Sequence, residues 1–286
     1  MPEHVTICEV GPRDGLQNEA EFVSADDRVR LIDLLSACGL RYIEAASFVS
    51  PKWVPRMAGG HEVLSGIARR SGVVYAALTP NIRGYEEALL ARANEVAVFA
   101  SASENFSRKN INCTIAESLA RYDIICGRAR TDGMPVRGYV SCAIACPYEG
   151  PVAPNAVAKV AMSLLAMGCR EVSLGDTIGV ATVADTARLL DAVLSEIPAD
   201  MIAGHFHDTH GRALDCISAS LGRGIRVFDA SVGGTGGCPF APGAKGNIAT
   251  DGVARMLQAQ GYATGIDTDA LDEATDFMLH LLGRKE

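Results

Sequence analysis

The sequence is poor in aromatic residues, has no excess of positive charge and contains no long apolar run. Only 6% of its 286 residues are aromatic, with a single tryptophan, so it offers no platform for stacking nucleobases. Its net charge is −8, whereas a general nucleic-acid surface needs a basic stripe. No apolar run approaches the ~20 residues that span a bilayer. We therefore expect neither a nucleic-acid partner nor a membrane partner, while a local cationic patch for a phosphorylated ligand stays compatible with the acidic total.

Targeting signals and paired metal-binding thiols are also missing. The chain begins almost at once with a strand-like segment and shows neither a secretory signal nor an Arg-rich presequence. Cys142 and Cys146 lie four apart, but no second thiol pair follows to complete a zinc knuckle. Five of the nine cysteines lie in apolar stretches and are typical of small core residues: Cys8, Cys38, Cys126, Cys169 and Cys216. A reducing, cytoplasmic location is the prediction.

Short apolar runs rich in β-branched residues alternate with amphipathic helical stretches. The expected strands end near Val10, Ala46, Leu78, Ala100, Cys142, Leu174, Phe206 and Val232. The first helix lies between Ser24, which forms a capping-box pattern with Asp27, and Gly39. Further helices are expected near 56–70, 83–93, 114–130, 154–168, 182–195, 211–222, 248–259 and 268–282. Eight strands, each followed by a helix, close most simply into a (β/α)8 TIM barrel.

An open, doubly wound α/β sheet is the alternative fold. Such a sheet usually carries a glycine-rich dinucleotide fingerprint after its first strand, and the turn at 11–15 lacks that spacing. No linker rich in Pro, Ser or Gly divides the chain. We therefore predict a single catalytic domain over residues 1–286, with a short C-terminal helical addition packed outside the barrel.

In such a barrel the chemistry lies at the carboxyl ends of the strands. The polar residues expected at this rim come from widely separated segments: Arg13, Asp14, Glu44, Ser47, Asp176, Thr177, His205, His207, Cys238 and Asn247. His205 and His207 are two apart on a strand, so their imidazoles face the same side. The pair alone is ambiguous, because paired or buried histidines need no ligand.

A divalent metal site best explains the polar residues at this rim. The two imidazole nitrogens, a carboxylate oxygen of Asp14 and an amide oxygen of Asn247 would suit Mg²⁺ or Mn²⁺. The ligand types leave zinc and iron open. A turn carboxylate at Asp14 and a helix cap at Asn247 are the structural alternatives.

Three charged residues near the rim invite either a structural or a chemical explanation. Arg13 would stabilise an enolate oxygen, or simply pair with a neighbouring carboxylate. Glu44 lies in an apolar strand and needs a partner, for which Arg13 is the candidate. Asp176 would orient a neighbour or transfer a proton.

Cys238 lies among glycines in the loop at 233–239, where a structural cysteine is unusual. A thiol on such a loop is a candidate acid or base, with an incidental turn thiol as the alternative. The glycines are not a phosphate loop, because no Gly-Lys-Ser/Thr follows with the required spacing.

Several segments, in order along nearly the whole chain, resemble the 3-hydroxy-3-methylglutaryl-CoA lyase family. They are GPRDGLQNE at 11–19, SFVSPKWVP at 47–55, KNIN at 109–112, RGYVSC at 137–142, CPYEG at 146–150, SLGDTIG at 173–179, HFHDT at 205–209 and GGCP at 236–239. The Arg-Asp and His-x-His elements alone would indicate only the wider group of metal-dependent barrel lyases and Claisen-type synthases. The segment at 11–19 and the Cys238 loop narrow the resemblance.

The resemblance implies an Mg²⁺- or Mn²⁺-dependent barrel enzyme that cleaves an acyl-CoA substrate to acetyl-CoA and acetoacetate, in leucine degradation or ketone-body metabolism. It implies metal ligands at Asp14, His205, His207 and Asn247. Catalytic roles are implied for Arg13, Glu44, Asp176, His205 and Cys238. Arg13, Ser47, Asn110 and Thr177 are expected to bind substrate. A homodimer is also expected from the resemblance.

Departures from the family pattern bear on the acyl group. Ala20 stands where lysine is frequent, Phe240 where tyrosine is common, and His210 where tyrosine is frequent. The nearest rival is therefore a lyase for a related substrate such as 3-hydroxy-3-isohexenylglutaryl-CoA or citramalyl-CoA.

Three other classes of protein are less consistent with the sequence. A Claisen synthase usually has a longer chain with an added C-terminal region. A TIM-barrel metal hydrolase usually takes its His-x-His from strand 1, and a non-catalytic binding protein would not need this set of rim residues together.

Overall fold

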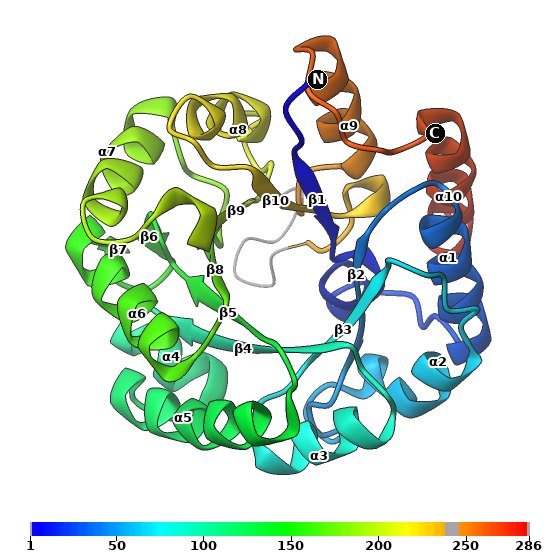
Figure 1. The fold of residues 1–286 in the computed structure, drawn as a ribbon, viewed down its shortest axis with the longest axis horizontal. Coiled ribbons are helices and arrows are strands. Elements are labelled where there is room, and N and C mark those ends of the chain that lie inside the picture. The colour runs from blue at the N-terminus through cyan, green and yellow to red at the C-terminus, as the bar shows by residue number, and fades with distance from the viewer. Residues whose placement is uncertain (1, 238–245, 285–286) are drawn as a thin grey trace.

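Eight parallel strands close into a barrel that a ring of helices surrounds (Figure 1). The computed structural model describes residues 2–237 and 246–284. The barrel strands are β1 (Thr6–Glu9), β2 (Tyr42–Ser47), β3 (Val74–Leu78), β4 (Glu95–Ser101), β5 (Val136–Ser141), β8 (Glu171–Asp176), β9 (Ile202–Phe206) and β10 (Val227–Ala230). Each barrel strand pairs with the next barrel strand along the chain, and β10 returns to β1. The TIM-barrel prediction is confirmed.

The helices that follow these strands match the expected pattern of alternating elements. They are α1 (Ala25–Ala37), α2 (Gly60–Gly66), α3 (Ile82–Leu90), α5 (Ile115–Asp132), α6 (Pro154–Met167), α7 (Val183–Leu194), α8 (Ala213–Leu221) and α9 (Thr250–Ala259). Ser24 caps α1 by accepting the N–H of Asp27 at 3.1 Å. The Asp27 carboxylate accepts from the Ser24 hydroxyl at 2.7 Å.

Three local features differ from the expectation. Helix α4 (Glu104–Ile111) was not expected, because its residues are mostly polar and Phe106 is its one buried large apolar side chain. A short hairpin of β6 (Ala145–Cys146) and β7 (Gly150–Pro151) follows β5. Helix α2 is shorter than the predicted 56–70, because Gly59 takes a positive φ of 81° between the turn η2 (Pro55–Met57) and the helix.

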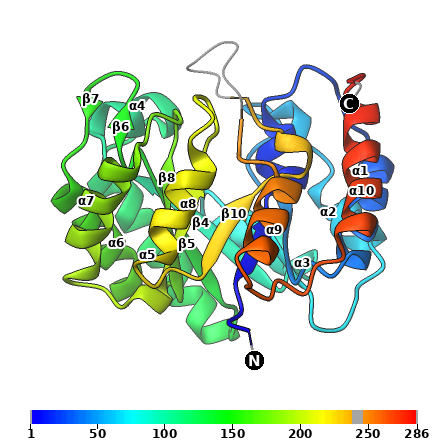
Figure 2. The ribbon, with the colours of Figure 1, turned by 90° about the horizontal axis from the view of Figure 1, so that it is seen from above.

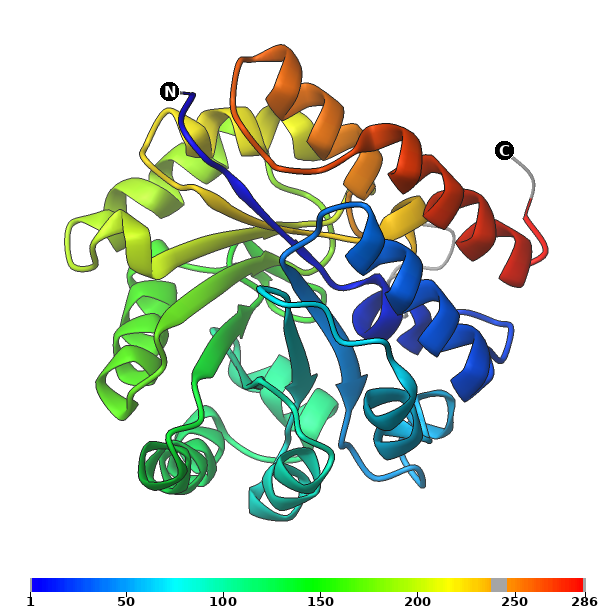
Figure 3. The ribbon, with the colours of Figure 1, turned by 45° about the vertical axis from the view of Figure 1, so that its right-hand side comes forward.

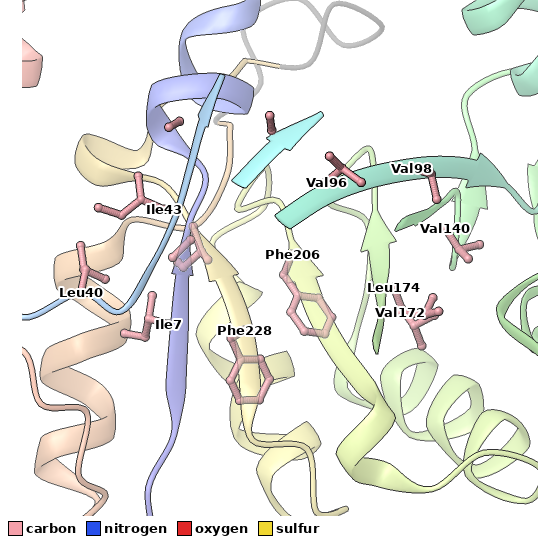
Figure 4. Packing of buried hydrophobic residues seen from close by; sticks show 14 of the residues in the cluster. Ile7, Leu40, Ile43, Val96, Val98, Val140, Val172, Leu174, Phe206 and Phe228 are labelled. Atoms are coloured by element: carbon pink, nitrogen blue, oxygen red, sulfur yellow. The ribbon is translucent and has the colours of Figure 1, made fainter. Parts of the chain in front are cut away.

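The main apolar core lies between the barrel and the helices. Side chains on the outer face of the strands fill it, as Figure 4 shows for Ile7, Ile43, Val98, Val172 and Phe228. All five are at most 3% exposed. This layer holds the strands in register, so that their carboxyl ends form a fixed rim.

The last helix, α10 (Thr268–Leu281), packs beside α1 and closes the ring (Figure 3). It ends at the opposite end of the barrel from the entry into β1 (Figure 2). The predicted helical addition at 268–282 is thus confirmed. Among the described residues, no helix has the length and apolarity that a membrane crossing requires.

The inside of the barrel contains buried polar and charged side chains beside small apolar clusters. Hydrogen bonds there join strands that are not neighbours, such as Tyr139 on β5 with Glu44 on β2. Arg137 on β5 likewise pairs with Asp229 on β10. Such contacts can form only across the interior, so charged side chains stand directly beneath the rim.

Glu9 is a buried carboxylate at the carboxyl end of β1, on the outer side of the barrel. Its Oε1 accepts the N–H groups of Gly11 at 2.7 Å and Val232 at 2.9 Å. Its Oε2 accepts the hydroxyl proton of Thr250 at 2.6 Å. The carboxyl group therefore joins β1 to α9 and to the turn η4 (Val232–Gly234).

Replacing Glu9 with glutamine is expected to remove a pH dependence of stability. Burial raises the pKa of Glu9 from 4.5 to about 7. The folded protein therefore keeps this proton up to about pH 7, whereas the unfolded chain releases it near 4.5. As pH rises through this window, the wild-type protein should lose up to about 3 kcal/mol of unfolding free energy.

Glutamine keeps an oxygen acceptor and cannot ionise, so Glu9→Gln should gain stability relative to wild type between pH 5 and pH 8. Urea unfolding at both pH values measures this difference. The exposed Glu86→Gln is a matched control. An equal difference at both pH values would contradict the prediction.

Candidate metal centre and active-site cavity

A cavity of about 740 Å³ opens at the carboxyl ends of the barrel strands. Its size lies within the range of small-molecule sites. Six of the residues predicted for the site line it: Arg13, Asp14, Asn110, Thr177, His205 and His207. Four apolar side chains, Leu78, Phe99, Phe106 and Val140, form part of the same wall.

Arg13 and Asp14 enter the cavity from a tight turn directly after β1. The turn η1 (Gly11–Gly15) is a π-helical turn. The Val10 carbonyl accepts the N–H groups of Asp14 at 2.7 Å and of Gly15 at 3.1 Å. Folding the backbone back on the end of β1 keeps both side chains over the barrel.

The Arg13 guanidinium is held by two carboxylates. Its Nε donates to Oε1 of Glu44, and its Nη1 donates to Oδ1 of Asp14 at 2.6 Å. The Tyr139 hydroxyl donates to the other Glu44 oxygen at 2.5 Å. Burial alone would lower the pKa of Arg13, but Glu44 and Asp14 raise it above its ordinary value. The predicted Arg13–Glu44 pair is confirmed, and Arg13 is a fixed positive charge in the cavity.

Asp14, His205 and His207 come together as a group that could hold a metal ion. One ligand atom from each residue lies within 4.8 Å of the others. Asn247 lies beside them, because its side-chain amide donates to Oδ2 of Asp14 at 2.9 Å. A backbone bridge between His207 and Asn247 brings the two residues together.

The ionisation of Asp14 and His207 suits a cation. Burial would raise the pKa of Asp14, but Arg13 and the two histidines hold it below its usual range. Burial, with the charge of His205, lowers the pKa of His207 to about 4. His207 is therefore neutral at pH 7, the form in which imidazole binds metal.

Two further observations test whether a divalent ion fits. Nδ1 of His205 lies 3.1 Å from Oδ2 of Asp229. This contact fixes the ring and leaves Nε2 for a ligand. Among the described residues, the buried Nδ1 of His207 has no hydrogen-bond partner. An anionic carboxylate, two imidazoles and a neighbouring amide therefore fit a divalent metal ion.

The remaining predicted residues lie in different surroundings. Ser47 is buried outside the cavity lining, and its Oγ accepts the N–H of Val49 at 3.3 Å. Thr177 lines the cavity and accepts the N–H of Cys142 at 2.8 Å. Cys238 lies outside the described residues.

Asp176 is buried and does not line the cavity. Its carboxylate accepts the N–H groups of Val180 at 3.2 Å and Ala181 at 2.8 Å. Burial raises the pKa of Asp176, against these backbone hydrogen bonds. Asp176 thus orders the loop between β8 and α7.

Sequence reasoning missed the residues beneath the site. Asp229, Arg137 and Tyr139 lie inside the barrel, in contact with predicted site residues. Arg137 and Tyr139 are two apart on β5 and so face the same side. That spacing in a buried strand was the available signal.

The chain is similar to known proteins along nearly its whole length. The family model described as HMGL-like matches residues 4–278. A Pseudomonas aeruginosa protein named "3-hydroxy-3-isohexenylglutaryl-CoA/hydroxy-methylglutaryl-CoA lyase" is 55% identical over 99% of this chain and 95% of its own length.

Solved structures are similar in both sequence and fold. An HMG-CoA lyase from Brucella melitensis has a TM-score of 0.97 and 58% identity, over 98% of this chain and 99% of its own. An HMG-CoA lyase from Acinetobacter baumannii, in complex with coenzyme A and 3-methylmalate, has a TM-score of 0.94 and 38% identity, over 99% and 92% of the two chains. With its matching barrel and its Asp14, His205 and His207 group, this chain belongs to the HMGL-like family.

Proposed function

We propose that this protein is a divalent-metal-dependent lyase that cleaves 3-hydroxy-3-methylglutaryl-CoA to acetyl-CoA and acetoacetate. The observation that carries the proposal is the juxtaposition of a buried, permanently charged Arg13 with the Asp14, His205 and His207 group in one cavity. The name of a relative that is 55% identical supports the substrate class.

The metal ligands in this proposal are Asp14, His205, His207 and Asn247. When bound, Mg²⁺ or Mn²⁺ would polarise the substrate oxygens and make the tertiary hydroxyl more acidic. Arg13 would stabilise the negative oxygen that develops on the thioester carbonyl. Glu44 would hold the Arg13 fork in place, because it accepts from Nε of Arg13 and from the Tyr139 hydroxyl.

The reaction is a retro-Claisen cleavage. The hydroxyl proton passes to a base, and the alcohol carbon becomes the ketone of acetoacetate. The bond to the carbon next to the thioester breaks, and its electron pair forms the enolate of acetyl-CoA. A proton delivered to that carbon completes acetyl-CoA. We propose Asp176, or a relay through His205, as the base and Cys238 as the proton donor.

The cavity mouth supports a coenzyme A ester. Lys109 and Arg121 both line the cavity and offer cations to phosphate groups. Lys109 Nζ lies 3.8 Å from the ring centroid of Tyr148. The apolar wall would contact the acyl chain. Asn110 and Thr177, which also line the cavity, are the proposed substrate-binding residues together with Arg13, and Ser47 would act from behind the lining.

Release of acetyl-CoA from purified protein tests the proposed function. With Mg²⁺ or Mn²⁺ present, 3-hydroxy-3-methylglutaryl-CoA should give equal amounts of acetyl-CoA and acetoacetate. The single tryptophan, Trp53, is 84% exposed and lines the cavity, so binding of a CoA ester should change its fluorescence. Binding without product formation would contradict the lyase.

The second candidate is the same reaction on a longer branched substrate. The double name of the Pseudomonas aeruginosa relative and the apolar wall favour it. Measuring kcat/KM for 3-hydroxy-3-methylglutaryl-CoA, its isohexenyl analogue and citramalyl-CoA ranks the three. A higher value for either rival would replace the first candidate.

The two proposed proton-transfer residues should respond differently to substitution. Cys238→Ser is expected to lower kcat by at least about 100-fold with little change in KM, because serine is a much weaker acid than a tuned thiol. Asp176→Asn should lower both kcat and the melting temperature, since it also loses a charged acceptor for Val180 and Ala181. If kcat per folded molecule is unchanged in Asp176→Asn, the residue only orders its loop.

We also propose a homodimer, which follows from the family resemblance, and a cytoplasmic location, which the free cysteines of the described residues support. Light scattering on the purified protein and fractionation of the source cells measure them. A monomer at assay concentration, or recovery in a membrane-enclosed compartment, would contradict the respective proposal.

A further inference from the structure

We propose that Arg137, at the centre of the barrel, is a positioning residue that couples the orientation of His205 to that of Arg13. The inference rests on the proposed function, which makes His205 a metal ligand and Arg13 the group that stabilises the enolate oxygen. Arg137 itself does not line the cavity and would act only through its neighbours.

One arm of the network runs from Arg137 to the metal centre. Nη2 of Arg137 lies 2.8 Å from Oδ1 of Asp229 in an ion pair. Oδ2 of the same carboxylate lies 3.1 Å from Nδ1 of His205 and accepts from the Ser173 hydroxyl at 2.7 Å. The position of Asp229 therefore decides which way the His205 ring faces.

The other arm runs to Arg13. Nη1 of Arg137 donates to the Tyr139 hydroxyl oxygen at 2.9 Å. The Tyr139 hydroxyl donates in turn to Oε2 of Glu44 at 2.5 Å, and Glu44 Oε1 accepts from Nε of Arg13. A tyrosine that both accepts and donates transmits the position of one guanidinium to the other.

The guanidinium fork makes this coupling possible. Arg137 is fully buried, and its Nε forms a third contact with Oε1 of Glu171 at 2.7 Å. Three partners at three different nitrogens suit the guanidinium of arginine, whereas the single ammonium nitrogen of lysine could not reach all three in the same way. The fork cannot shift toward Asp229 without changing its contact with Tyr139.

Three variants and two readouts test the coupling. Asp229→Asn breaks the His205 arm, Tyr139→Phe breaks the Arg13 arm, and Arg137→Lys weakens both. The readouts are the Kd for Mn²⁺ alone, measured by electron paramagnetic resonance without substrate, and kcat and KM with 3-hydroxy-3-methylglutaryl-CoA. Melting temperatures accompany both readouts.

Asp229→Asn is expected to raise the Mn²⁺ Kd by about 10- to 100-fold. Tyr139→Phe should leave that Kd within about twofold of wild type and lower kcat by at least about 10-fold, at nearly constant KM. Arg137→Lys should change both. In the Asp229→Asn background, Tyr139→Phe should cost less in kcat than it does alone, because the two arms share Arg137.

Arg170→Lys is the matched control. Arg170 pairs with Glu95 at 2.6 Å and with Glu171 at 3.5 Å, so it borders the Arg137 network at Glu171, but no contact joins it to Asp229 or Tyr139 among the described residues. It should leave both readouts within about twofold, even if the melting temperature falls. A purely structural role for Arg137 would make its variant resemble this control.

The proposal is overturned if Asp229→Asn keeps the wild-type Mn²⁺ Kd, or if the two arms are fully additive in kcat. Should Arg137→Lys fail to fold, the other two variants and their double mutant still decide. If wild-type protein binds Mn²⁺ but does not cleave the substrate, the proposed function fails, while the Mn²⁺ readout still tests the His205 arm.

Discussion

Substituting Arg13 with glutamine is expected to lower kcat by about 100- to 1,000-fold, or about 3–4 kcal/mol of transition-state stabilisation. Arg13 lines the cavity, and burial together with two carboxylate partners fixes its charge and direction. Glutamine is neutral and lacks the forked donors. It can still donate one hydrogen bond. We therefore expect kcat to fall by the amount that is typical of losing one strong oxyanion donor.

The pattern of kinetic constants distinguishes this role from simple substrate binding. An interaction made only as the enolate forms should appear in kcat, with KM changed little. Steady-state assays of purified variants at saturating Mg²⁺ or Mn²⁺ measure both constants. Arg83→Gln is the control, because among the described residues Arg83 pairs with Glu87 alone, at an exposed position on α3.

Two outcomes would contradict the Arg13 role. One is a wild-type kcat in Arg13→Gln. The other is a loss confined to KM, which would make Arg13 a binding residue only. Melting temperatures are needed alongside, since the variant leaves the buried Glu44 with Tyr139 as its remaining partner among the contacts described.

The residues at the rim of the barrel could be predicted because side chains at the carboxyl ends of the strands form the site in this fold. A barrel was expected from alternating strands and helices, and its carboxyl ends collect side chains that are distant in sequence. On that basis His205 and His207 were expected opposite Asp14, and they do lie together. The charge of Glu44 in an apolar strand required a partner, and Arg13 is that partner.

The interior of the barrel was not predictable in the same way. Strands buried on both faces give no alternation of polar and apolar residues, so inward positions do not stand out. Arg137 and Asp229 are charged residues in such strands, and only the closed register brings them to 2.8 Å. Their pairing depends on the tertiary structure, and no local sequence pattern predicts it.

Asp176 shows the opposite limitation. Its position at the carboxyl end of β8 suggested the cavity, but the side chain does not line the cavity, and its oxygens accept N–H groups of its own loop. One residue along a strand changes the face on which a side chain lies. Gly175, the preceding residue, lines the cavity instead.

Removal of divalent metal is expected to abolish turnover completely and reversibly. Without the metal, the site formed by Asp14, His205 and His207 lacks the divalent positive charge that would polarise the substrate oxygens. No other described side chain that lines the cavity carries two positive charges. Dialysis against a chelator, followed by addition of Mg²⁺ or Mn²⁺ in excess, should first remove and then restore acetyl-CoA release.

His207→Ala links this loss to the proposed site. Its ring is neutral at pH 7, and its buried Nδ1 has no hydrogen-bond partner among the described residues, so its replacement should weaken Mn²⁺ binding by at least about 100-fold. His61→Ala, at an exposed position on α2, controls for loss of any histidine. Activity that survives full chelation would remove the metal from the mechanism. Unchanged Mn²⁺ affinity in His207→Ala would instead move the metal away from this site.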